Sequence, residues 1–226
     1  MLEGFHALKH AVRFGASVQV AVTADPDGTR ALAAELAPDV AEALDALLEP
    51  VTREELRALV PRAHHTEVLA VARRPSVDVA AALAVPDVAD RPAVLLEDPR
   101  HLGNVGAVVR VAAAADAAAV LTTGAVDPWD PQALRGSAGL HFALPVAHVD
   151  TVPGGRPLVA LDPDGDDLLV PGAVPPGALL AFGTERHGLS DALLAQADAR
   201  VRIPMRAGVS SLNLATAVAA ALYGAR

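Results

Sequence analysis

Fully apolar runs and alanine-rich segments alternate along the second part of the chain, from residue 92 onward. The apolar runs show no polar alternation, as expected of parallel strands that are buried on both faces. The expected strands are 93–96, 118–121, 158–161, 178–182 and 200–204. Segments 106–115 and 211–223 have the length and composition of helices. The pattern predicts an α/β fold with a mostly parallel sheet covered on both faces.

Residues 1–75 have a different pattern, which predicts a small separate α/β unit. Its expected elements are a helix at 4–14, strands at 18–22 and 67–72, and alanine-rich helices at 31–36 and 40–48. Thr52 followed by Glu55 predicts a capping box at a further helix start. Residues 76–91, rich in proline and charge and with a short helix expected at 77–83, are expected to link this unit to a second domain at 92–226.

Composition narrows the class of protein. The chain has 226 residues, no cysteine and a net charge of −9, which excludes a disulfide scaffold and argues against nonspecific coating of nucleic acid. Its cations are arginines apart from Lys9, and arginine binds phosphate with a bidentate fork. The start resembles no signal peptide, and Arg110 and Asp116 interrupt the longest apolar stretch. We therefore expect a cytoplasmic protein that binds no membrane.

Three short polar signatures follow expected strands, where α/β proteins place their chemistry. In the first, Asn104 is expected to end a loop, Gly106 to open a helix, and Arg110 to lie one turn further on. A guanidinium on such an apolar helix needs an anionic partner. That partner is either a ligand or a core carboxylate such as Glu185 or Asp98.

The second signature is the loop after the strand 178–182. Gly183 permits a close approach of ligand or backbone, Glu185 follows, and Gly188 ends the loop. An ordinary glycine-rich turn is the alternative interpretation. In the third signature, Ile203-Pro204-Met205 ends a strand, and Ser210 or Ser211 is expected to cap the last helix.

Together the signatures resemble the SpoU (TrmH-type) family of RNA ribose 2′-O-methyltransferases in the SPOUT superfamily. The matching blocks are 104–110, 183–189 and 203–213, with Arg135–Gly139 and Leu144–Val146 between the first two. The likeness covers residues 92–226. The unit 1–75 is similar to the L30e-like RNA-binding domain often fused in front, with Glu3–Leu8 matching its opening.

The resemblance implies a SPOUT-type sheet with a C-terminal trefoil knot, a homodimer and S-adenosylmethionine as methyl donor, leaving S-adenosylhomocysteine. It implies methylation of RNA, with ribosomal RNA favoured over transfer RNA, and no metal. The implied catalytic residues are Asn104, Arg110, Glu185, Ser211 and Asn213. The implied cofactor-binding residues are Thr123, Gly124, Phe182, Gly183, Ile203, Met205, Ser211 and Leu212. Because a guanidinium stays protonated, we expect Arg110 to hold a phosphate and orient the 2′-oxygen rather than act as a base.

The chain departs from the family pattern at two places. Four residues, Arg100–Gly103, separate Asp98-Pro99 from Asn104, where the family often has one. Asp116 stands where glycine is usual. We expect the loop 99–104 to distinguish this member from its relatives.

A catalytically inactive RNA-binding module with the same fold is the main alternative, and an oxidoreductase of ordinary Rossmann topology lacks its glycine fingerprint. The acidic run Asp162–Asp167 does not match a calcium loop, so a surface turn is expected. His64-His65 has no matching ligand set and is expected in an exposed loop.

Overall fold

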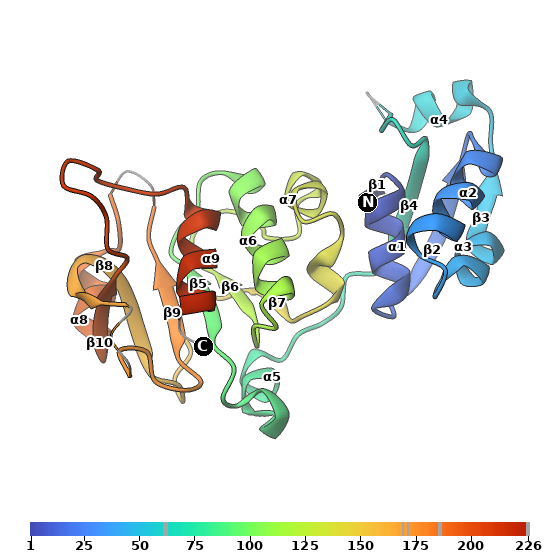
Figure 1. Cartoon of the computed structure of the whole chain (residues 1–226). Helices are drawn as coiled ribbons and strands as arrows, with labels where there is room; N and C mark the ends of the chain where they lie inside the picture. Colours follow the sequence, from blue (N-terminus) through green and yellow to red (C-terminus); the bar gives the residue numbers. More distant parts are fainter. Residues whose placement is uncertain (61–62, 169, 171, 185–186, 225–226) are drawn as a thin grey trace.

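A computed structural model of the chain describes residues 1–60, 63–168, 170, 172–184 and 187–224. The described residues form two α/β units, each built on its own sheet (Figure 1). A short stretch with helix α5 (Val79–Ala84) and the 3-10 helix η1 (Pro86–Val88) connects them. No helix in these ranges is long and apolar enough to span a membrane.

The N-terminal unit has a four-stranded sheet in the order β1-β4-β2-β3. Its strands are β1 (Leu2–Glu3), β2 (Val18–Thr23), β3 (Leu48–Pro50) and β4 (Val68–Ala72). Its helices are α1 (Phe5–Arg13), α2 (Pro26–Leu36), α3 (Ala41–Leu47) and α4 (Arg53–Leu59). The expected capping box is present at α4, where Thr52 and Glu55 cap each other. The short edge strand β3 was not anticipated from the sequence.

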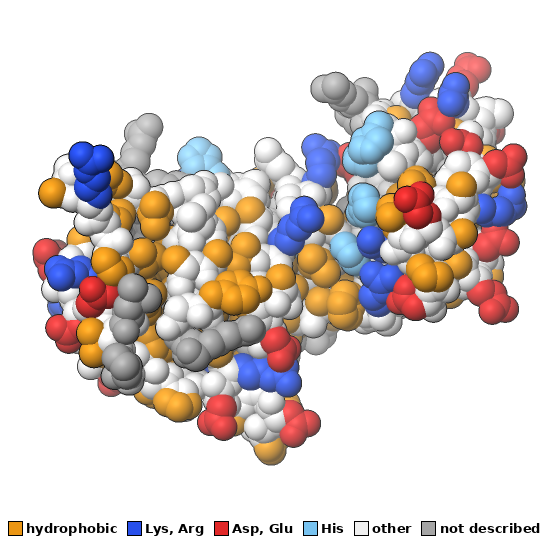
Figure 2. Space-filling view, in the orientation of Figure 1, with side chains coloured by type: hydrophobic (Ala, Val, Ile, Leu, Met, Phe, Trp, Pro, Cys, Tyr) orange, Lys and Arg blue, Asp and Glu red, His pale blue; other side chains and the backbone are white. Residues whose placement is uncertain are grey.

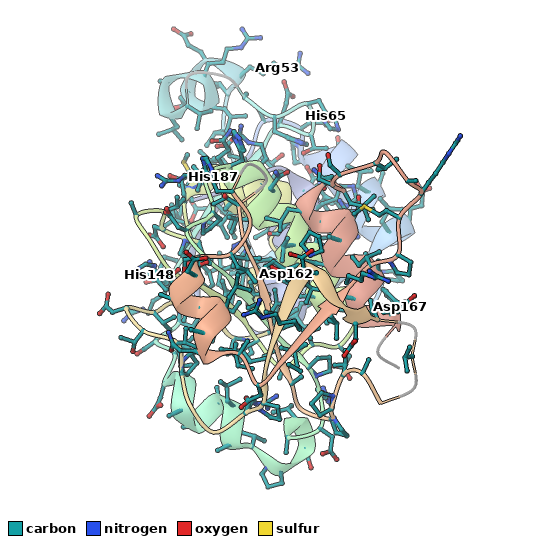
Figure 3. The ribbon with its side chains drawn as sticks, turned by 90° about the vertical axis from the view of Figure 1, so that its left-hand side faces the viewer. Arg53, His65, His148, Asp162, Asp167 and His187 are labelled. Atoms are coloured by element: carbon teal, nitrogen blue, oxygen red, sulfur yellow. The ribbon has the colours of Figure 1, made fainter. Side chains whose placement is uncertain are left out.

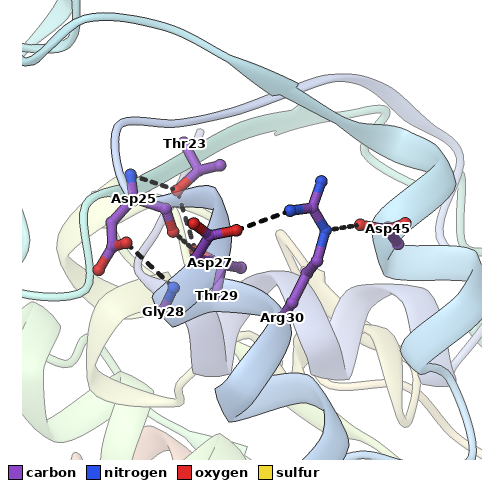
Figure 4. Close-up of polar contacts among 7 residues, drawn as sticks. All are labelled: Thr23, Asp25, Asp27, Gly28, Thr29, Arg30 and Asp45. Atoms are coloured by element: carbon purple, nitrogen blue, oxygen red, sulfur yellow. Dashed lines mark hydrogen bonds and ion pairs between the residues drawn. The ribbon is translucent and has the colours of Figure 1, made fainter.

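Polar contacts tie α2 to its neighbours (Figure 4). Asp25 caps α2 by accepting a hydrogen bond from the Gly28 amide at 3.0 Å. Arg30 bridges Asp27 within α2 and Asp45 on α3, at 3.0 and 2.7 Å. The Asp27, Arg30 and Asp45 side chains are all exposed, so these ion pairs add little to the stability of the fold. They help to orient α2 against α3.

The second unit has a six-stranded sheet in the order β10-β8-β9-β5-β6-β7, and its strand pairs are parallel. Its strands are β5 (Ala93–Leu96), β6 (Val120–Thr122), β7 (Val146–His148), β8 (Leu158–Asp167), β9 (Leu179–Phe182) and β10 (Ala199–Arg202). Its helices are α6 (Leu102–Ala114), α7 (Pro131–Gly136), the 3-10 helix η2 (Leu140–Phe142), α8 (Asp191–Gln196) and α9 (Leu214–Gly224). The predicted α/β fold with a mostly parallel sheet is confirmed.

Both faces of this sheet are buried, which explains its apolar strands. On β5, Val94 and Leu96 join the core that α6 and α9 cover, whereas Ala93 and Leu95 join the core beneath α8. All four side chains are buried. A strand with two covered faces has no polar positions to alternate with apolar ones.

Helix α6 differs from the expectation at both ends. It begins at Leu102, so Asn104 and Gly106 lie inside its first turns rather than at a loop and a helix start. Two of the four residues that separate Pro99 from Asn104 therefore belong to this helix. At the other end, Asp116 adopts a left-handed conformation with φ 50° and pairs with Arg91 at 2.6 Å. Aspartate tolerates this conformation better than most residues, so it substitutes for the usual glycine.

The two units are docked through α1 and the turn before η2. Gly139, with φ 78°, lies so close to α1 that a Cβ there would be 2.5 Å from the carbonyl oxygen of Ala7. His10 Nδ1 lies 2.8 Å from the carbonyl oxygen of Ala138. Phe5 and Leu8 share one continuous buried core with residues of α6 and the second sheet. The two units therefore pack directly against each other through a shared hydrophobic core.

The buried side chain of His141 contacts residues that precede this turn in the chain. His141 Nε2 donates to the Pro128 carbonyl at 2.8 Å, and Nδ1 lies 2.7 Å from the Ser137 hydroxyl. Because a carbonyl oxygen can only accept, the first bond requires a proton on Nε2. Burial lowers the pKa of His141 to about 4, only partly opposed by the bond to Pro128.

This lowered pKa makes the stability of the protein depend on pH. The unfolded chain binds a proton at His141 near its ordinary pKa of 6.5, whereas the folded chain resists it until about 4. Stability from this group is complete above the unfolded pKa and is lost as pH falls, by about 3 kcal/mol in total. Denaturant titrations at several pH values should show this slope in the wild type and a flatter one in His141→Gln. Equal slopes in the two proteins would contradict the assignment.

Candidate functional site

An open cleft lies where β8, β9 and β10 meet the segment before α9. Six of the eight predicted cofactor-binding residues line it: Phe182, Gly183, Ile203, Met205, Ser211 and Leu212. Its walls are mainly apolar, with Leu161 and Leu214 adding to the predicted side chains. The structure therefore gathers segments from the second and third signatures into one concave surface.

One wall of the cleft is a bulge in β8. Arg200 of β10 pairs with Ala160, but the next residue, Val201, pairs with Asp166. The residues 161–165 that this register shift leaves out of the ladder include Asp162 and Pro163, which line the cleft. The expectation of a surface turn at Asp162–Asp167 was therefore wrong. Polar residues occur there because this half of β8 pairs only with β10 and is partly exposed.

Asp162 contributes a carboxylate to the cleft lining. The sequence analysis did not predict this residue as part of the site. Figure 3 views this side of the molecule, with Asp162 near the middle and Asp167 toward the edge. The signal available in the sequence was the apolar run ending at Leu161, since residues that follow a parallel strand commonly enter a site.

The loop after β9 is built around Gly183. A Cβ at this position would overlap the backbone of Gly188, so no side chain fits. Thr184 and Gly188 exchange two backbone hydrogen bonds of 3.0 Å and close the loop. The predicted catalytic residue Glu185 lies outside the described residues. The close approach expected at Gly183 is therefore made by the chain itself.

Asn213 joins the first signature to the third. Its side-chain oxygen accepts from the backbone amides of Ala215 and Thr216 at 3.0 and 3.4 Å, so it caps α9. The expectation that Ser210 or Ser211 would cap this helix was wrong. The Asn213 amide also lies 3.4 Å from Asn104 Oδ1 on α6. One side chain thus fixes the start of α9 and contacts the helix that carries Arg110.

Arg110 is exposed on α6 and does not line the cleft. Within the described residues it forms no ion pair, and Asp98, one candidate partner, pairs instead with Arg100. Its positive charge acts on His6 and Lys9 of α1, whose pKa values it helps to lower. The other candidate partner, Glu185, is not described. Arg110 is therefore exposed, and its charge reaches α1 of the N-terminal unit.

Thr123 and Gly124 also lie away from this cleft. The Thr123 hydroxyl accepts a hydrogen bond from the Asp98 amide at 3.1 Å, and a Cβ at Gly124 would collide with Asp98. Asp98 itself has φ 44°. Both residues hold the loop that leads into α6.

A second cleft adjoins the first and shares Thr184 and Gly188 with it. Its lining includes Glu97, whose carboxylate accepts from the Ser190 amide and hydroxyl at 2.7 and 2.5 Å. His101 and His187 also line it. Sequence reasoning did not identify these residues, because isolated histidines in loops carry no motif. The described residues contain no cluster of three or more His, Asp or Glu that could hold a metal ion.

Comparison with known proteins identifies the family of this chain. The model of the SpoU rRNA Methylase family matches residues 91–223, so the chain belongs to that family. The predicted resemblance is confirmed.

Two curated relatives are similar to this chain over part of their length. A 23S rRNA (uridine(2479)-2′-O)-methyltransferase of Streptomyces viridochromogenes is 36% identical over 174 residues, covering 70% of this chain and 59% of that protein. A 23S rRNA (adenosine(1067)-2′-O)-methyltransferase of Streptomyces azureus is 32% identical over 149 residues, 61% of this chain and 55% of that one. The matches thus span somewhat more than half the length of these curated relatives.

A solved structure matches nearly the whole chain. The SpoU methyltransferase AviRb from Streptomyces viridochromogenes, crystallised with AdoMet, superposes with a TM-score of 0.78 and 32% identity. The match covers 99% of this chain and 88% of that one. Both units, and not only the second, therefore have counterparts in a methyltransferase.

The two functions of Asn213 are separable by substitution. Asn213→Ala should lower the free energy of unfolding by about 1 kcal/mol, because α9 loses its cap. Asn213→Asp keeps an oxygen acceptor and should stay within a few tenths of a kcal/mol of the wild type, although it loses the amide donor toward Asn104. Thr216→Ala, exposed on α9, is the matched control. Chemical denaturation measures all three, and equal losses in the Ala and Asp variants would argue against capping.

Proposed function

We propose that this protein methylates a ribose 2′-hydroxyl of ribosomal RNA with S-adenosylmethionine as methyl donor. The observation that carries the proposal is the match of both units to a SpoU methyltransferase crystallised with that cofactor. The curated relatives named as 23S rRNA 2′-O-methyltransferases favour ribosomal over transfer RNA. Because those two act on a uridine and an adenosine, family membership alone does not define the base.

The chemistry of the cleft fits the proposed cofactor. Apolar walls from Phe182, Ile203 and Leu212 suit a flat adenine ring, and backbone groups around Gly183 suit its polar edge. The Asp162 carboxylate suits a cationic or hydroxyl-bearing group. When bound, the cofactor supplies an electrophilic methyl group on a sulfonium. We assign Phe182, Gly183, Ile203, Met205, Ser211 and Leu212 to its binding, with Thr123 and Gly124 supporting the neighbouring Asp98 loop.

The polar edge of the site is assigned to the RNA. Arg110 holds a phosphate next to the target ribose, because an exposed guanidinium without a carboxylate partner among the described residues is available to one. Asn104 and Asn213 at the start of α6 and α9, and Ser211 in the cleft lining, orient the 2′-oxygen. Glu185 belongs to this set by its position in the family motif. The hydroxyl proton leaves late, to phosphate or water.

Further parts of the proposal concern the whole molecule. The unit at residues 1–75 binds RNA as an L30e-like domain, and 76–91 serve as its linker to the methyltransferase domain at 92–226. Two copies form a homodimer, with the segment between β10 and α9 threaded as the family's trefoil knot. The enzyme acts in the cytoplasm and needs no metal.

Transfer of a labelled methyl group tests the function directly. Wild-type protein should label deproteinised 23S rRNA, with the product mapped by mass spectrometry as a 2′-O-methyl nucleotide. Arg110→Ala should lose about a hundredfold or more in rate, because it removes the group that orients the acceptor. Arg200→Ala, which removes an exposed cation of β10 that lines neither cleft, should keep full activity.

Cofactor affinity in calorimetry should be nearly the same for Arg110→Ala and the wild type. RNA binding by the wild type without methyl transfer would support the inactive RNA-binding module instead. Substantial turnover by Arg110→Ala would refute the assigned role of this arginine.

Gly183→Ala tests the cleft. The added methyl group must displace the loop that closes through Thr184 and Gly188, so cofactor affinity should fall at least about tenfold and stability by about 1–3 kcal/mol. Gly154→Ala is the matched control, because a Cβ there meets nothing within 4 Å. Calorimetry at a temperature where both variants are folded measures the affinity. Unchanged affinity in Gly183→Ala would place the cofactor elsewhere.

A further inference from the structure

The second cleft lies directly beside the cofactor cleft and has room for a ligand of its own. Its volume is about 830 Å³, a size typical of sites that bind small molecules. Thr184 and Gly188 line both clefts, and the two backbone hydrogen bonds between these residues close the loop that separates them. A group bound in the second cleft therefore lies next to the cofactor proposed for the first.

The carboxylates of the second cleft serve its framework. Glu97 accepts hydrogen bonds from the amide and hydroxyl of Ser190 at 2.7 and 2.5 Å, which joins the end of β5 to the start of α8. Asp98 pairs with Arg100, and its amide donates to the Thr123 hydroxyl at 3.1 Å. These contacts hold the walls of the cleft in place, so the side chains left to meet a ligand are its two histidines.

His101 and His187 line the cleft, and both are exposed. Within the residues that the structure describes, neither imidazole takes part in a hydrogen bond or an ion pair, and His187 donates its backbone amide to the Thr184 hydroxyl at 3.1 Å. Figure 2 shows histidine at the upper edge of the second unit, the edge at which its strands end. An imidazole offers a flat ring and polar nitrogens, which suit stacking on an unpaired RNA base and hydrogen bonding to its edge.

The position of His101 relates this cleft to the residues assigned to the ribose. Its carbonyl accepts hydrogen bonds from the amides of Asn104 and Val105 at 2.9 and 3.1 Å, so His101 precedes Asn104 by about one helical turn. Residues at this spacing are neighbours on a helix surface. Asn104 also lies 3.4 Å from Asn213. A nucleotide whose ribose contacts the two asparagines can therefore place its base beside His101.

We propose that the second cleft binds the base of the methylated nucleotide, turned out of the RNA, and that His101 and His187 contact this base and determine specificity for it. The inference rests on the proposed function and deepens it, because it assigns the surface that selects the base. A base held in this cleft keeps its ribose between the asparagines and the methyl donor. His101 is one of the four residues that separate Pro99 from Asn104, so this surface includes the segment in which the chain departs from the family pattern.

Chemical modification tests the contact without methyl transfer. Diethylpyrocarbonate acylates exposed imidazoles, and S-adenosylhomocysteine in place of the methyl donor prevents turnover. Deproteinised 23S rRNA should slow modification of His101 and His187 at least about fivefold. His148, exposed on β7 and outside both clefts, is the internal control and should react at an unchanged rate. Undiminished modification of either cleft histidine in an RNA-bound sample, or equal protection of His148, would overturn the proposal.

Kinetics on a synthetic RNA fragment test the selection of the base. The fragment carries the mapped target nucleotide either intact or as an abasic ribose, and the wild type should prefer the intact form at least about tenfold in kcat/KM. His101→Ala and His187→Ala should each lose most of this preference, because they remove the stacking and polar contacts. His148→Ala should keep it.

Both cleft variants should retain the cofactor affinity of the wild type, since neither histidine lines the cofactor cleft and His101 does not cap α6 through its side chain. Calorimetry thus verifies that they are folded. An unchanged preference for the intact base in the two variants would refute the role of the second cleft alone. Protection of the two histidines by RNA that the wild type does not methylate would instead refute the proposed function.

Discussion

The main-chain contact between Ala7 and Gly139 is the constraint on which the arrangement of the two units depends. It brings α1 as close to the second unit as two backbones approach, and only glycine at position 139 permits it. The contact lets Phe5 and Leu8 enter the core shared with α6. Because packed cores deform little, α1 and α6 keep a fixed separation.

The cleft likewise depends on the backbone more than on side chains. Two backbone features shape it. One is the bulge in β8 that leaves Asp162 unpaired with β10, and the other is the loop in which Gly183 touches Gly188. Both expose main-chain groups at the ends of buried parallel strands. A cofactor recognised through such groups imposes few demands on residue identity, which suits a chain whose cleft walls are mostly small or aliphatic.

The parts of the fold that the sequence predicts are those governed by local pattern. β5 and β9 are identifiable because burial on both faces requires an unbroken apolar run. The start of α6 was misplaced because Gly103 and Asn104 are typical of loops, whereas the structure accommodates them in the first turn. The second half of β8 was missed because its polar residues pair only with β10.

Tertiary placement accounts for the differences in the site. The motif predicts Arg110 and Asn213, but the capping of α9 by Asn213 and the exposure of Arg110 follow from how the helices pack. Periodicity reports what a segment buries, and it carries no information about which distant segment it meets.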